Sequence, residues 1–123
     1  MKIRCVENSI RYRLRKSDIK KLREQNFVYD RVGFGGGHVF KFTLKVGQKI
    51  NLSADFIDGE IIIELPAVQF KKWANTSEVS IEEKLKLEND KHLHVLIEKD
   101  FPCKDREEDI SDTFFELNPD EAC

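Results

Sequence analysis

A run of basic side chains near the start of the chain carries the most distinctive chemistry in the sequence. Arg11, Arg13 and Arg15 alternate with apolar residues, so they share one face of a predicted strand. The basic run continues through Lys16, Lys20, Lys21 and Arg23. An arginine guanidinium donates paired hydrogen bonds to phosphate or carboxylate oxygens. We therefore predict that these residues bind an anionic partner.

Charge is divided unevenly along the chain. The net charge is only −2, but residues 1–50 hold 13 Lys/Arg against 4 Asp/Glu, and the remainder holds 8 against 19. The oppositely charged parts either neutralise each other within the fold or leave a basic face for an acidic partner. The basic face is also compatible with plain solvation, or with covering by the acidic C-terminal segment.

Two histidines form a second candidate site. His92 and His94 lie two residues apart on a predicted strand and face the same side, and Cys103 follows. No third ligand stands at a spacing typical of a metal-binding family. We predict no metal site and no cofactor, and keep a metal-dependent activity through His92 and His94 as an alternative.

Two further motifs give no support for catalysis. The glycine-rich run 33–37 has His38 where a phosphate loop would need glycine, and it joins two strands rather than leading into a helix, so we predict a hairpin tip. The sequence has no G-x-S-x-G motif, and its paired acids stand in polar runs where they are solvated, without the apolar surroundings that a general acid needs. We predict that the protein is not an enzyme.

Cysteine use and hydropathy bear on location. Cys5, Cys103 and Cys123 are an odd set without a C-x-x-C spacing, which favours reduced thiols in a cytosol, with Cys5 in the interior. No run approaches the roughly 20 apolar residues of a membrane helix, and no apolar stretch typical of a secretory signal follows Met1. We expect a cytoplasmic protein with no membrane association.

Alternating apolar residues predict mainly strands. Strands are expected at 10–15, in a hairpin over 27–46, at 50–57 and 61–65 around an Asp-Gly turn, from 79 onward and at 93–97. Ser17 is the expected N-cap of a helix over about 17–25, and Pro66 suits the first turn of a second helix. Tyr12 and Trp73 fall on inward positions and are expected in the core. The predicted class is α+β, a mostly antiparallel barrel or sandwich.

Shifting the sequence by 51 residues aligns these elements with one another. Leu14 then falls on Leu65, Ile10 on Ile61 and Leu22 on Trp73. We interpret this as two ββαββ repeats, 2–47 and 53–98, within one domain at 1–99. The alternative is that two amphipathic strand–helix units look alike without common descent.

Each repeat resembles the swapped-hairpin unit of AbrB/MazE-like proteins, in which a strand ending in I-x-I-P leads into a short helix. Residues 63–66, Ile-Glu-Leu-Pro, carry the likeness; Gln69 departs from it, as does Arg15 in place of the proline in the first repeat. The resemblance implies a pseudo-twofold fold, and a fused pair of units would close as a monomer. It also implies DNA binding through basic residues at the strand end and helix start.

The whole chain also resembles a group of small uncharacterised bacterial proteins, in segments such as 8–11, 73–74 and 98–101, and this likeness implies no activity. Residues 100–123 are acidic with scattered phenylalanines; they either dock in part on the body, which we favour, or remain mobile. We predict a non-enzymatic binding protein with a basic face toward an acidic partner. The alternatives are a swapped-hairpin DNA-binding regulator and an antitoxin-like protein whose acidic segment occupies a partner's site.

Overall fold

The computed structural model describes residues 1–101 together with 114 and 117. Within this part the chain forms eight strands, two α-helices and one 3₁₀ turn. In chain order these are β1 (Lys2–Val6), β2 (Ser9–Leu14), α1 (Lys16–Gln25), β3 (Phe27–Gly35), β4 (His38–Gly47), β5 (Ser53–Ile57), β6 (Glu60–Pro66), α2 (Ala67–Ala74), β7 (Ser80–Lys86), η1 (Glu88–Asp90) and β8 (His92–Lys99).

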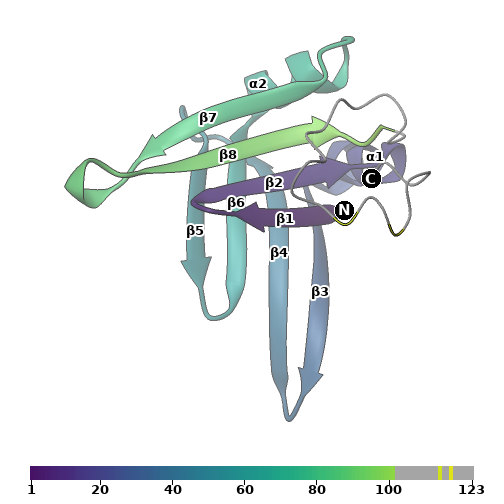
Figure 1. The fold of residues 1–123 in the computed structure, drawn as a ribbon. Coiled ribbons are helices and arrows are strands. Elements are labelled where there is room, and N and C mark those ends of the chain that lie inside the picture. The colour runs from purple at the N-terminus through teal and green to yellow at the C-terminus, as the bar shows by residue number, and fades with distance from the viewer. Residues whose placement is uncertain (102–113, 115–116, 118–123) are drawn as a thin grey trace.

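The strands form two four-stranded sheets, ordered β1-β2-β8-β7 and β3-β4-β6-β5. Figure 1 shows the sheets crossing one another, with α1 and α2 beyond the ends of strands. Neighbouring strands pair antiparallel within each hairpin, whereas the central pairs β2–β8 and β4–β6 are parallel. The predicted α+β class with mostly antiparallel strands is confirmed. The barrel is not: the described strands make two separate sheets.

Each sheet contains one hairpin from each half of the chain. The order strand–strand–helix–strand–strand occurs in residues 2–47 and again in 53–99. Lys2 pairs with Arg13 and Ser53 with Glu64, positions that differ by the expected 51 residues. In the second hairpins the matching pairs are Val28–Leu44 and Ile81–Ile97, which differ by 53. The internal duplication itself stays a prediction.

Local chemistry explains where the helices begin and end. The N-cap of α1 is Arg15, two residues before the predicted Ser17, because the Asp18 carboxylate accepts the N–H of Arg15 at 2.8 Å and fixes the first turn. It ends at Gln25, and the left-handed backbone of the C-cap residue Asn26 (φ 67°) suits a helix C-terminus. Pro66 stands at the N-cap of α2, one position before the predicted first turn.

Tight turns fall where the sequence predicts them. The Asp58-Gly59 turn joins β5 to β6 with positive φ at both residues. The tip between β3 and β4 holds Gly35, Gly36 and Gly37, all with positive φ, which confirms the predicted hairpin tip and places no helix after it.

Tyr12, in the middle of β2, packs against residues of the other sheet. Its side chain is fully buried, its ring centroid lies 6.0 Å from that of Phe42, and its hydroxyl donates to the carbonyl of Ile61 at 3.4 Å. Burial raises the pKa of the Tyr12 phenol far above its ordinary value. Trp73 is also fully buried and donates its indole N–H to Val79 O at 3.0 Å. Both core predictions are confirmed.

Three further expectations concern the burial of Cys5, membrane association and the C-terminal segment. Cys5 is exposed, not interior, because it lies near the hairpin end of β1, an edge strand. No helix in the described part of the chain is long and apolar enough to cross a membrane. The predicted docking of residues 100–123 lies outside the described residues, apart from Asp100, Phe101, Phe114 and Leu117, the last three of which are exposed.

We expect Tyr12→Ala to lower the free energy of unfolding by about 3–5 kcal/mol, because it removes a buried ring that bridges the sheets. Tyr12→Phe keeps the ring and loses only the bond to Ile61, which should cost about 1 kcal/mol. Urea denaturation followed by circular dichroism measures both. Equal losses for the two variants would contradict a bridging role for the ring.

Candidate binding site

The fold divides the predicted cations between a strand and the helix that follows it. Arg11 and Arg13 lie on β2, Arg15 stands between β2 and α1, and the remaining four are on α1: Lys16, Lys20, Lys21 and Arg23. They do not form a single uncovered strip. Their surroundings divide them into a neutralised group on β2 and an open group on α1.

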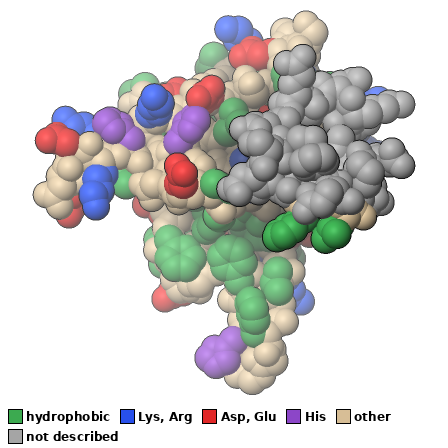
Figure 2. All heavy atoms as spheres, viewed as in Figure 1, with side chains coloured by type: hydrophobic (Ala, Val, Ile, Leu, Met, Phe, Trp, Pro, Cys, Tyr) green, Lys and Arg blue, Asp and Glu red, His purple; other side chains and the backbone are tan. Residues whose placement is uncertain are grey.

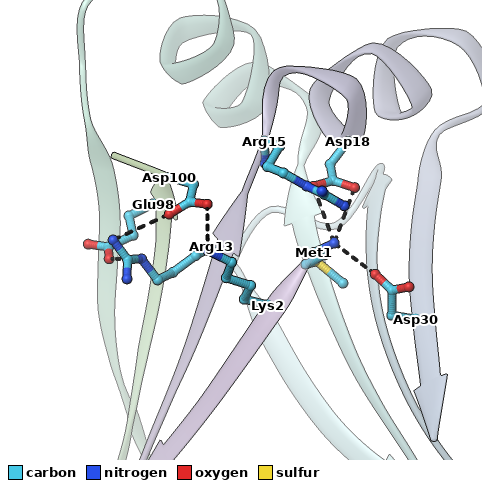
Figure 3. A network of polar contacts seen from close by, with 8 residues as sticks. All are labelled: Met1, Lys2, Arg13, Arg15, Asp18, Asp30, Glu98 and Asp100. Carbon is cyan, nitrogen blue, oxygen red and sulfur yellow. Dashed lines mark hydrogen bonds and ion pairs between the residues drawn. The ribbon is translucent and has the colours of Figure 1, made fainter. Parts of the chain in front are cut away.

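The β2 arginines are neutralised by acids at the end of β8, as Figure 3 shows for Arg13. Arg13 lies opposite Glu98 in the parallel pair, and its Nε comes within 3.1 Å of Glu98 Oε1; Arg11 Nε lies 3.7 Å from the same oxygen. The Arg13 side chain is only 13% exposed, so its charge is partly desolvated. The contact is an ion pair without a directed hydrogen bond from Arg13 Nε.

Asp100 completes this cluster (Figure 3). Its carboxylate lies 3.0 Å from Lys2 Nζ and 3.4 Å from Arg13 Nη2, and its N–H donates to Leu14 O at 2.8 Å. The bond from Lys2 lowers the pKa of Asp100 below its ordinary value of 3.8, and the charges of Arg13 and Arg15 act in the same direction. Glu98 and Asp100, from the second half of the chain, therefore form ion pairs with Arg13 and Lys2 of the first half.

A second cluster surrounds the N-terminal amino group. The α-amino nitrogen of Met1 is buried and lies 3.3 Å from the Asp18 carboxylate and 2.7 Å from Asp30 Oδ2. Arg15 Nε lies 4.0 Å from the same Asp18 carboxylate, and the Arg15 side chain is 65% exposed. Sequence reasoning missed Asp18 because a lone acid within a basic run looks like a solvated residue.

The cations of α1 are much less compensated. Among the described residues, no carboxylate lies within ion-pair distance of Lys16, Lys21 or Arg23, and Lys20 meets only the exposed Glu24 at 4.0 Å. Such an exposed pair contributes little. Arg23 instead donates to Ala74 O at 3.0 Å and to Asn75 Oδ1 at 3.1 Å.

A cavity of about 450 Å³ opens beside these cations. It lies between α1, the ends of β2 and β8, and the end of α2. Apolar side chains and cations both contribute to its lining, which comprises Leu14, Lys16, Ile19, Arg23, Ala74, Lys99, Asp100 and Phe101. Lys99 was not among the predicted site residues; its Nζ donates to Thr76 O at 2.8 Å and lies 5.6 Å from the centre of the Trp73 ring. An anion with an apolar body suits such a lining.

The histidine site does not assemble in the described residues. His94 Nε2 contacts Glu82 Oε1, and His92 is exposed. No group of three or more His, Cys, Asp or Glu side chains in the described part is placed to hold a metal ion. Cys103 lies outside the described residues.

Sequence reasoning also missed an exposed apolar surface. Figure 2 shows hydrophobic side chains gathered on the part of the β3-β4-β6-β5 sheet that projects past the other sheet. Phe34 is 69% and Phe56 68% exposed there, and Val32 pairs with the half-buried Phe40. The same alternation that predicted a core face marks this surface, because no described element covers its outer part.

The fold and the site define a small two-sheet α+β domain with a basic, apolar-lined cavity. The chain belongs to a family of unknown function, DUF7009, whose family model matches residues 1–119. No curated protein and no solved structure was found to match it. The AbrB/MazE-like relationship stays a prediction.

We expect Asp100→Asn to destabilise the protein at pH 7 by about 1 kcal/mol, because it leaves Lys2 and Arg13 without this carboxylate. A carboxyl whose pKa is lowered on folding stabilises above its unfolded value and loses that effect as pH falls through its folded value. The difference from the unsubstituted protein should therefore shrink as pH drops below 3.8.

Urea unfolding at a series of pH values measures this effect. Asp55→Asn is the matched control, since Asp55 is exposed and has no ion pair with a described residue. A pH-independent loss for Asp100→Asn, or an equal loss for the control, would contradict the role given to Asp100.

Proposed function

We propose that this chain is a non-enzymatic binding protein whose basic end receives an acidic segment of a partner protein. The observation that carries the proposal is the excess of uncompensated positive charge beside the cavity. Lys16, Arg23 and Lys99 all line the cavity, and none has a carboxylate within ion-pair distance among the described residues. Complementary charge steers an acidic partner to such a surface and fixes its orientation.

The proposed binding site lies on α1 rather than on β2. Arg11 and Arg13 are engaged with Glu98 and Asp100, so they support the fold at this end rather than a ligand. The ligand-facing residues are then Arg15, Lys16, Lys20, Lys21 and Arg23, with Lys99 added.

The proposal includes the architecture in which this site is held. Two related ββαββ units, of swapped-hairpin type, complete each other's sheets within one chain. Matching element order and matching hairpin pairs support this view. A chain that supplies both hairpins of each sheet does not need a second copy to complete them, so we propose that the protein is a monomer. We also propose that it acts in the cytoplasm.

A second candidate function is DNA binding of the swapped-hairpin kind. One observation favours it: Arg4 lies directly opposite Arg11 on the β1–β2 hairpin, is exposed, and pairs with no described carboxylate. Together with α1 this would give a basic surface on two elements. The neutralisation of Arg11 and Arg13 weakens it, because phosphates would compete with Glu98 and Asp100.

Binding of fluorescein-labelled decaglutamate, measured by anisotropy, tests the proposal. Charge reversal of Lys16 and Lys21 together should weaken binding on the order of tenfold, since two uncompensated cations become anions. Reversal of Lys84 and Lys86, exposed cations on β7, is the matched control and should change affinity less than twofold.

Duplex DNA in the same assay separates the two candidates. Equal losses for both double variants, or no binding of decaglutamate, would overturn the proposal. Tighter binding of DNA than of decaglutamate, with affinity falling steeply as salt rises, would favour the DNA-binding regulator.

A further inference from the structure

We infer that the cavity beside α1 receives one large apolar side chain of an acidic peptide, so that the partner is recognised as a run of acids built around an aromatic or leucine residue. This inference rests on the proposed function and specifies the partner's chemistry. It follows from the construction of the cavity, which places apolar walls between fixed cations.

The apolar walls come from three elements. Leu14 ends β2, Ile19 lies on the inner face of α1, and Ala74 ends α2 with a side chain too small to fill the gap between the helices. Leu14 and Ile19 belong to the core, while Phe101 at the edge is 47% exposed. A polar group placed against these walls would lose water without gaining a hydrogen bond, so the buried part of a ligand must be apolar.

The cations at the edge are held in place by the fold. Arg23 bridges from α1 to Ala74 O and Asn75 Oδ1, and Lys99 is anchored on Thr76 O and over Trp73. Both groups keep further N–H donors for a ligand, since a guanidinium carries five and an ammonium three. Prearranged donors spare the ligand part of the ordering cost of binding.

Charge decides which ligand fits. Among the described lining residues the one carboxylate, Asp100, is already engaged with Lys2 and Arg13. Lys16, Arg23 and Lys99 therefore give an excess of positive charge around the apolar walls of the cavity. In a peptide, acidic residues would match these cations and an apolar residue between them would match the walls. A volume of about 450 Å³ is in the range of sites that enclose ligands. Nucleic acid fits less well, because polar base edges would be buried against Leu14 and Ile19.

Two labelled heptapeptides binding to the full chain test the inference. One is Glu-Asp-Glu-Phe-Glu-Asp-Glu, and the other has alanine in place of phenylalanine. The phenylalanine peptide should bind at least about tenfold more tightly, as expected for burial of an aromatic side chain. Ala74→Leu fills the cavity and should abolish this preference while keeping the affinity for the alanine peptide.

Ala67→Leu is the matched control, because Ala67 is a half-buried alanine on the same helix that does not line this cavity. It should keep the tenfold preference. If Ala74→Leu does not fold, Phe101→Ala serves instead, since it removes an exposed wall and should reduce the preference.

The outcomes separate this inference from the proposed function. Equal affinity of both peptides for the unsubstituted protein would overturn the inference and leave acidic binding in place. A preference that survives in Ala74→Leu, or in Phe101→Ala where that variant is used, would place the phenylalanine elsewhere and also overturn it. Failure of both peptides to bind would overturn both proposals.

Discussion

The parallel pairing of β2 with β8 and of β4 with β6 joins the two halves of the chain, and the rest of the structure depends on it. Within each hairpin the two strands hydrogen-bond to each other. The free edge of one strand of each hairpin is paired by a strand from the other half of the chain. Isolated two-stranded hairpins are marginal in water. The pairing therefore completes both sheets, and the core between them forms only when both halves are in place.

The same pairing determines the electrostatics of the candidate site. Placing β8 beside β2 sets Glu98 opposite Arg13 and carries the chain on to Asp100, so acids of the second half reach cations of the first. Because these ion pairs engage the arginines of β2, the cations beside the cavity that lack a described carboxylate partner lie on α1 and at Lys99. Part of the uneven charge of the sequence is therefore used in ion pairs between the two halves, and part lies on exposed cations of α1.

Much of the fold could be predicted because it follows from local patterns. Alternation gave the strands, positive-φ glycines the tip at 35–37, and inward spacing the burial of Tyr12 and Trp73. Features that depend on which strands meet could not be read locally. Cys5 is exposed because it lies on an edge strand, and each sheet is completed by a parallel pair between the two halves. The cavity depends on tertiary packing, because residues of α1, β2 and α2 together line it.

Native-state hydrogen exchange of the full chain tests most directly whether both halves form one cooperative structure. The amides of the two central pairs, at positions such as Tyr12, Ile97, Leu44 and Ile63, should exchange only through global unfolding. Their opening free energies should then agree with one another and with the value from urea denaturation. Exchange of one sheet at a free energy lower than the other by more than about 2 kcal/mol would show that the sheets open separately and would contradict this account.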